Sequence, residues 1–209
     1  MLELSNVYLF IIASFLLCLA PGPDNIYVLT QGMTKSKKAA IITTLGLCTG
    51  IVIHTAAAAF GISVIFKTSE IAFNIVKFAG AAYLLYIAYQ AFKYRNAPLD
   101  LSVQDSSSEL KKLYIKGFFM NVLNPKVSIF FLAFLPQFVS PANGNVPMQM
   151  ITLGVIFMIL TVIVFSSIGV AGNILSSKLL EKPSIVKYMN VLTSFVLGGL
   201  AVKLALSSR

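Results

Sequence analysis

The stretch LAPGPDNIYVLTQG, residues 19–32, interrupts a long apolar run with two prolines, a glycine between them and then an acid, Asp24. Proline removes a backbone donor and clashes with the preceding turn, which costs about 3 kcal/mol in a helix interior. Inside a membrane such a break is tolerated where the freed backbone faces protein or a water-filled cavity. The stretch therefore predicts a broken transmembrane helix beside an internal site.

The composition is that of a multi-pass membrane protein. Of the 209 residues, 57% are hydrophobic and only 11% are charged, which is too apolar for an ordinary soluble domain. A membrane-spanning helix needs about 20 largely apolar residues. None of the long apolar stretches alternates as a strand would, so we predict an all-α membrane protein with six transmembrane helices. The predicted spans are at about 7–30, 39–66, 71–92, 114–139, 147–175 and 185–206.

The distribution of cations predicts the orientation in the membrane. Lysines and arginines concentrate in the loops after the first, third and fifth spans. By the positive-inside rule these loops are cytoplasmic, so both termini are expected outside, with membrane lipid as the surroundings. The net charge of +9 is then a topology signal. A nucleic-acid partner is not expected, because it would need a basic face on a soluble domain.

A polar segment at about 95–113 divides the chain into two parts. It contains a proline, three consecutive serines and several charges, and is predicted to be a cytoplasmic linker. We expect a single membrane domain over 1–209, with repeat one at about 1–94 and repeat two at about 114–209.

The two parts resemble each other. ITTLG at 42–46 matches MITLG at 150–154, and IVKF at 75–78 matches IVKY at 185–188. APGPDN in the first span and NVLNPKVS in the fourth are both proline-centred breaks followed by a charge. Because each part has three spans, the second is inserted upside down. This is the inverted-repeat plan of many secondary transporters, in which broken helices, here the first and fourth, mark the substrate site.

These motifs resemble the LysE superfamily of amino-acid exporters, and more closely its RhtB-like homoserine/threonine exporter branch. The loop after the first span departs from the family's Gly-Arg-rich turn but keeps its positive charge. The resemblance implies amino-acid export by alternating access, with a bacterial cytoplasmic (inner) membrane as the location, and suggests a homodimer. The segments that resemble the family are PGPDNIYVLTQG at 21–32, LGLCTGIVIHTAAAAFGISVIF at 45–66, KFAGAAYLLYIAYQAF at 77–92 and GFFMNVLNPKVSIFFLAFLPQFV at 117–139.

The two breaks are also predicted starts of half-helices. Asn124 is a good N-cap and Pro125 a good first helical residue. Pro23 can serve in the same way after Gly22. Each half-helix then presents free N–H groups and a positive dipole end near the membrane midplane. In oppositely oriented repeats the two ends would converge on one cavity.

Two charged residues follow the breaks directly. Asp24 is the only acid within a predicted span, and Lys126 lies in the middle of the fourth. A charge near the bilayer centre costs roughly 2.5–3.5 kcal/mol and usually marks a transport path. We expect Lys126 and the half-helix N-termini to bind the carboxylate of an amino acid, and Asp24 its ammonium group. The predicted substrate-binding residues are Pro21, Gly22, Pro23, Asp24, Asn25, Asn121, Asn124, Pro125 and Lys126. The alternative is an Asp24–Lys126 ion pair that only holds the breaks together.

His54 is the only histidine of the chain. It follows Gly46 and Gly50 at steps of four, so the three share a helix face whose glycines allow close approach of another helix. A histidine titrates near neutral pH, and this one lies deep in a span. Asp24 and His54 are therefore the predicted proton-coupling residues. The alternative for His54 is a packed core residue.

The sequence contains no catalytic constellation, no metal-ligand spacing and no phosphate loop, so we expect neither an enzyme nor a cofactor. The favoured function is proton-driven export of amino acids or related small zwitterionic metabolites, with no particular amino acid indicated. One alternative is an intramembrane thiol/disulfide electron carrier, because CLAP at 18–21 resembles the redox break of DsbD-type carriers. The second cysteine, Cys48, is however on the second span and not on the symmetry-related one. The other alternative is a passive channel or membrane scaffold.

Overall fold

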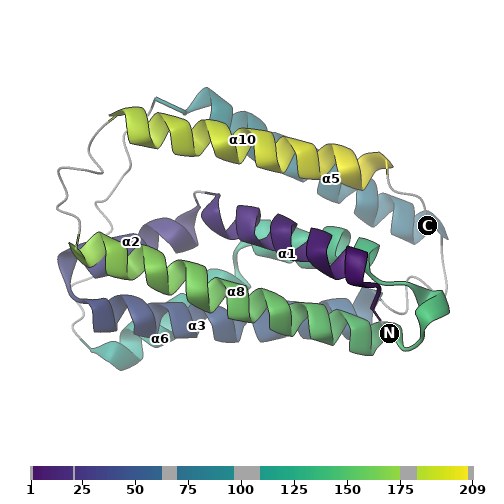
Figure 1. Cartoon of the computed structure of the whole chain (residues 1–209), viewed down its shortest axis with the longest axis horizontal. Helices are drawn as coiled ribbons and strands as arrows, with labels where there is room; N and C mark the ends of the chain where they lie inside the picture. The colour runs from purple at the N-terminus through teal and green to yellow at the C-terminus, as the bar shows by residue number, and fades with distance from the viewer. Residues whose placement is uncertain (1, 21, 63–69, 97–108, 175–182, 207–209) are drawn as a thin grey trace.

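The structure, a computed structural model, describes residues 2–20, 22–62, 70–96, 109–174 and 183–206 (Figure 1). Within these ranges the regular elements are helices and none is a strand, which confirms the predicted all-α class. Most of the predicted linker lies outside the described residues.

The first predicted span consists of two helices. α1 (Leu4–Leu19) and α2 (Pro23–Thr34) are bent by 59° at the break. Helix α1 can end there because the backbone amide of its C-cap, Ala20, still bonds back to the Leu16 carbonyl, while Pro23 has no amide hydrogen to continue the helix. The predicted break in the first span is confirmed.

The fourth predicted span is broken in the same way. α6 (Leu110–Val122) and the segment that begins with α7 (Pro125–Ile129) are bent by 48°. After α7 the chain continues as a π-helical turn, η2 (Phe130–Phe134), and a tighter 3₁₀ turn, η3 (Leu135–Phe138). The described helix α6 begins four residues before the predicted span.

The other helices are unbroken. They are α3 (Lys37–Ala56), which runs into the π-helical segment η1 (Ala57–Ile62), α5 (Glu70–Lys93), α8 (Val146–Ile174) and α10 (Pro183–Leu206), with a short turn η4 (Pro141–Asn143) before α8. Within the described residues, Lys37–Gly61 and α8 are each long and apolar enough to cross a membrane. Each bent pair passes the same criterion as one broken span, which makes up to four.

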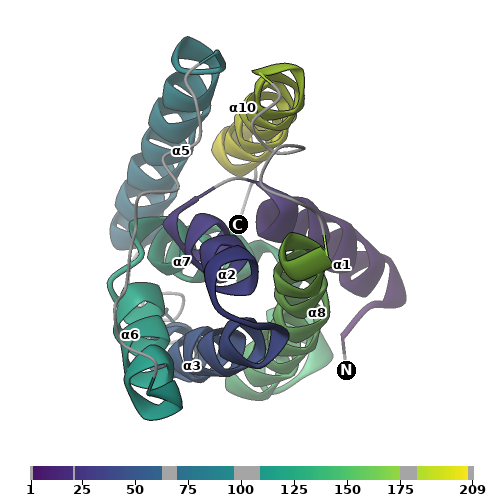
Figure 2. The same ribbon diagram turned by 90° about the vertical axis from the view of Figure 1, so that its left-hand side faces the viewer.

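The helices form two groups. α5 and α10 lie side by side and contact η2 and α1, beside the bundle in which α2 lies among α3, α6 and α8 (Figures 1 and 2). In the bundle α3 packs on α6, α8 packs on both α1 and α2, and α3 also contacts α8. The second helix of each half therefore packs on the broken helix of the other half. This packing brings the two breaks together.

Glycines permit the closest helix crossings. A Cβ atom at Gly46 of α3 would overlap the backbone carbonyl of Tyr114 on α6, and one at Gly32 of α2 would overlap that of Gly169 on α8. Backbone atoms cannot move aside as a flexible side chain can, so any other residue would separate the helices. The predicted close approach of another helix to the Gly46 face is confirmed, and the approaching helix is α6.

The core is dominated by phenylalanines that join α1, the segment from η2 to η3, and α8. Neighbouring rings of this aromatic cluster have centroids 5.0–6.0 Å apart, in tilted or edge-to-face arrangements that favour the ring quadrupoles. Its members are Phe10, Phe130, Phe131, Phe134, Phe138 and Phe157. The aromatic cluster closes the bundle on the η2–η3 side of the second break.

A buried polar site between the two helix breaks

Local capping chemistry determines where each half-helix begins. Gly22 is the N-cap of α2 and Pro23 its first residue. At the second break the Asn124 side chain accepts a hydrogen bond of 3.0 Å from the backbone amide of Lys126, and Pro125 is the first residue of α7. Both predicted helix starts are confirmed. Pro21 lies outside the described residues.

The carbonyls freed at the end of α1 are satisfied by side chains. Lys126 donates from Nζ to the Ala20 carbonyl at 2.8 Å, and Asn25 donates from Nδ2 to the Cys18 carbonyl. Such partners are needed because the last carbonyls of a helix have no intrahelical donor. The second break thus supplies a cap for the first, and a Cβ at Gly22 would lie 3.5 Å from the Lys126 ammonium nitrogen.

The Asp24 carboxylate contacts an amide and not the lysine. Its Oδ2 accepts a hydrogen bond of 3.1 Å from Nδ2 of Asn121, whereas its Oδ1 is buried without a hydrogen-bond partner. Both Asp24 and Lys126 are described residues, only 3% and 8% exposed, and no ion pair within 4.0 Å joins them. The alternative of a direct Asp24–Lys126 ion pair is wrong for this structure, because the Lys126 ammonium is directed to the Ala20 carbonyl.

Asn121 connects three helices. Its backbone carbonyl lies 3.0 Å from Nε2 of His54 on α3, and its side chain bonds to Asp24 on α2. A carbonyl oxygen can only accept, so His54 donates from Nε2. Asn121 fills the space beside Gly50, because a Cβ atom added to Gly50 would lie 2.8 Å from the Cβ atom of Asn121. His54 is therefore linked to Asp24 through a single residue.

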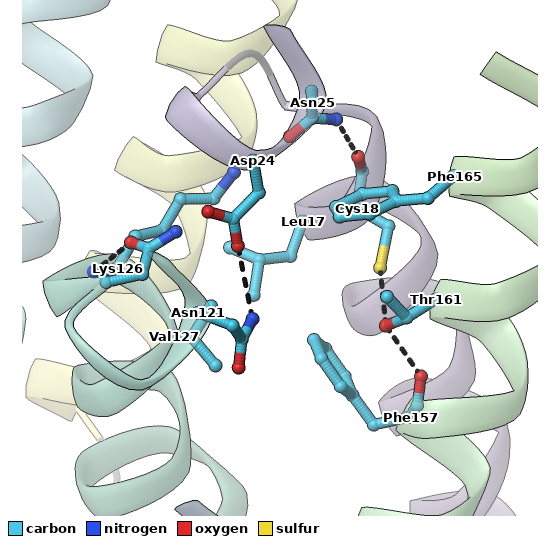
Figure 3. A pocket seen from close by; sticks show the side chains of 11 residues that line it. Leu17, Cys18, Asp24, Asn25, Asn121, Lys126, Val127, Phe157, Thr161 and Phe165 are labelled. Atoms are coloured by element: carbon cyan, nitrogen blue, oxygen red, sulfur yellow. Dashed lines mark hydrogen bonds between the residues drawn. The ribbon is translucent and has the colours of Figure 1, made fainter. Parts of the chain in front are cut away.

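The two half-helix starts converge on one cavity (Figure 3). Its volume of about 20 Å³ is room for about one water molecule. Buried acceptors without a hydrogen-bond partner belong to two of its lining residues, Oδ1 of Asp24 and Oδ1 of Asn121. The lining residues are Leu17, Cys18, Asp24, Asn25, Asn121, Asn124, Lys126, Val127, Phe157, Thr161 and Phe165.

Five of the predicted site residues line this cavity, namely Asp24, Asn25, Asn121, Asn124 and Lys126. Gly22, Pro23 and Pro125 shape the two helix starts, and His54 reaches the cavity only through Asn121.

The α8 side of the cavity was not predicted. Phe157, Thr161 and Phe165 follow one another at steps of four, a spacing that signals a shared helix face. Helix α8 is apolar on every side, so the spacing by itself did not indicate which face is inside.

The two cysteines are free thiols with separate polar neighbours. Sγ of Cys18 lies 3.5 Å from Oγ1 of Thr161, and Sγ of Cys48 donates to the Met158 carbonyl at 3.7 Å. Within the described residues, no three His, Cys, Asp or Glu side chains lie close enough to hold a metal ion.

Apolar helices of membrane-spanning length, together with two broken helix pairs that bring buried charged residues to one cavity, are typical of multi-pass membrane transporters. The chain matches the model of the LysE type translocator family over residues 15–208 and belongs to that family. This confirms the family indicated by the sequence motifs. Members of the family are translocators and not enzymes, as expected for this chain.

Individual relatives cover most of the chain. It is 31% identical to the homoserine/homoserine lactone efflux protein of Salmonella typhimurium over 159 residues, 76% of each chain. It is 30% identical to the uncharacterized membrane protein YrhP of Bacillus subtilis over 203 residues, 92% of this chain and 94% of the relative. It is 24% identical to the leucine efflux protein of an Enterobacter species over 204 residues, 96% and 95% of the two chains. No solved structure matches the chain.

Proposed function

We propose that the protein exports amino acids or related small zwitterionic metabolites by secondary active transport. The observation that carries this proposal is a buried carboxyl group and a buried amino group, those of Asp24 and Lys126, which line one cavity with no ion pair within 4.0 Å between them. A carboxylate and an ammonium group are costly to bury without a direct ion pair, and a zwitterion supplies the complement of both. Relatives named as efflux proteins for homoserine and for leucine support the same substrate class.

In the proposed complex the substrate replaces contacts that the protein makes with itself. The substrate carboxylate binds the Lys126 ammonium and the amides at the starts of α2 and α7. The substrate ammonium binds Asp24, whose Oδ1 already lacks a donor. Asn25, Asn121 and Asn124 add neutral hydrogen bonds around the two charges.

The described form of the cavity corresponds to a closed stage of alternating access. Small-molecule sites usually measure about 300–1,000 Å³, so a cavity of about 20 Å³ must widen to admit an amino acid. The aromatic cluster lies on one side of the cavity. A second apolar cluster, of Tyr27, Ala39 and Leu113, joins α2, α3 and α6. We propose that these two clusters open in turn during transport.

We further propose six spans in two inverted three-helix repeats, α1 to α5 and α6 to α10. The reciprocal packing supports this arrangement, since α3 packs on broken α6 and α8 packs on broken α1 and α2. Both termini then lie outside the bacterial cytoplasmic membrane, and repeat one, the linker and repeat two form one domain. The homodimer suggested by the family resemblance stays a prediction.

Proton antiport is the proposed energy source. Asn121 bonds to both predicted proton-coupling residues, to His54 through its backbone carbonyl and to Asp24 through its side chain, which couples their positions and supports proton binding at the carboxylate that takes the substrate ammonium. Moving one charge across 100 mV is worth about 2.3 kcal/mol, enough to sustain a gradient of roughly fifty-fold. No ATPase subunit is then required.

Inside-out membrane vesicles that contain the protein test this proposal. A proton gradient is imposed and the amino acids that accumulate are identified by mass spectrometry, with an uncoupler as control. We expect one or a few amino acids to accumulate in a way that the uncoupler abolishes. Accumulation unaffected by the uncoupler would refute proton coupling, and equilibration without accumulation would favour a passive channel. Absence of accumulation across the whole set of amino acids would favour another metabolite or the thiol carrier.

A further inference from the structure

The cavity has two chemically different sides. Asp24, Asn121 and Lys126 come from the two breaks, whereas α8 contributes Phe157 and Phe165, and Figure 3 shows the two groups facing each other across the pocket. Thr161 lies between the two phenylalanines on the same face of α8. The apolar wall, defined here as Leu17, Phe157, Thr161 and Phe165, is at most 6% exposed at each position.

The polar groups of the apolar wall are already used. The Thr161 hydroxyl donates to the Phe157 carbonyl at 2.8 Å. Its hydrogen is thereby committed, so the Cys18 thiol is the donor in the 3.5 Å contact with Oγ1 of Thr161. The described residues of the wall include no charged side chain, so nothing there would neutralise a charge brought in by a ligand.

We propose that the apolar wall is the subsite for the substrate side chain and that it selects amino acids with uncharged side chains over basic and acidic ones. The inference rests on the proposed function, in which Lys126 and Asp24 take the carboxylate and the ammonium group. The side chain is then left to face α8. A charged side chain would be buried there without a partner, which is strongly unfavourable.

Phe165 is the residue of the wall most free to set its size. The Phe157 ring is fixed in the aromatic cluster, with centroids 5.2 Å from those of both Phe130 and Phe131. Within the described part of the chain, Phe165 stacks on no other ring. Replacing Phe165 therefore enlarges the subsite without disturbing the cluster, whereas replacing Phe157 would remove a core contact.

The first test is competition in energised vesicles that transport a labelled amino acid. Leucine, threonine, lysine and glutamate are offered as unlabelled competitors. We expect leucine or threonine to compete at concentrations at least about tenfold lower than lysine or glutamate, since one methylene of fit alone is worth 10- to 200-fold. Equal competition by lysine or glutamate would overturn the inference and leave amino-acid export standing. Absence of transport of any amino acid would overturn the proposed function and the inference with it.

The second test changes the wall itself. In Phe165→Ala, the ratio of kcat/KM for phenylalanine to that for alanine is expected to rise at least about tenfold through KM. Val164→Ala is the matched control, because Val164 is adjacent, also 6% exposed and not part of the cavity lining. An equal change for both substrates, or the same shift in the control, would overturn the assignment. If the Phe165→Ala protein is not found in the membrane, Phe165→Leu is used instead. It should change the ratio of kcat/KM in the same direction, because it also removes side-chain volume, though less of it.

Discussion

His54 and Asp24 are joined through one residue, Asn121. The imidazole donates to the Asn121 carbonyl at 3.0 Å, and the Asn121 side chain donates to the Asp24 carboxylate at 3.1 Å. The three residues belong to α3, α6 and α2, so the link crosses from one half of the chain to the other. A change at the imidazole therefore has a short physical route to the carboxylate that faces the cavity.

The first prediction concerns the two buried charges. Asp24→Asn and Lys126→Met should each lower transport at least about 30-fold, because losing one partner of a buried charged interaction costs 2–5 kcal/mol. Uptake into energised vesicles measures the effect, with membrane insertion checked by immunoblot. Lys112→Met is the control, because Lys112 lies on the surface, where it pairs with Glu109 at 3.2 Å. This variant should transport at the normal rate. Robust transport by both site variants would contradict the binding model.

The second prediction concerns proton coupling. His54→Gln keeps a side chain that can donate to the Asn121 carbonyl but cannot titrate near neutral pH. We expect this variant to remain folded and to show a flatter dependence of transport rate on pH between about 5 and 8. The measurement is initial uptake at fixed membrane potential over that range. A pH profile identical to that of the wild type would assign His54 to packing alone.

The third prediction concerns helix crossing. Gly46→Ala should destabilise the protein by about 1–3 kcal/mol, because the new methyl group would push α3 away from the Tyr114 carbonyl on α6. Gly199→Ala is the matched control, since a Cβ there meets no atom within 4 Å. Thermal unfolding in detergent compares the two variants. A larger loss of stability in the control would contradict the packing of α3 on α6.

The fourth prediction concerns two buried glutamines with opposite environments. Gln31 is fully buried with both amide atoms unpartnered, whereas Gln149 bonds to the Ser140 amide at 3.0 Å and to its carbonyl at 2.9 Å. Gln149→Met should lower stability by about 1–3 kcal/mol, because it orphans both backbone groups. Gln31→Met should leave stability unchanged or raise it, since methionine has a similar shape and no polar atoms. Thermal unfolding of both variants decides, and equal destabilisation would refute the contrast.

Much of the architecture follows from local chemistry and is legible in the sequence. Pro23 and Pro125 are the first residues of their helices. Proline has no amide hydrogen to bond to a carbonyl of a preceding turn, so it ends the helix before it and is tolerated at the first position of the next. Asn124 caps its helix with its own side chain. The spacing of Gly46 and His54 also predicts a face that another helix can approach closely, and α6 lies against it.

The tertiary structure alone decided which partners these residues have. Lys126 contacts the Ala20 carbonyl instead of Asp24, a choice set by how the first break is placed against the second. The inward position of Phe157 and Phe165 likewise depends on packing. The faces of α8 are similarly apolar all the way round. Hydrophobic periodicity therefore does not show which face of the helix points into the protein. The sequence by itself determined where the helices break and that Asp24 and Lys126 follow the breaks inside apolar spans, because those follow from covalent chemistry and solvation. The cavity exists only where the two halves meet.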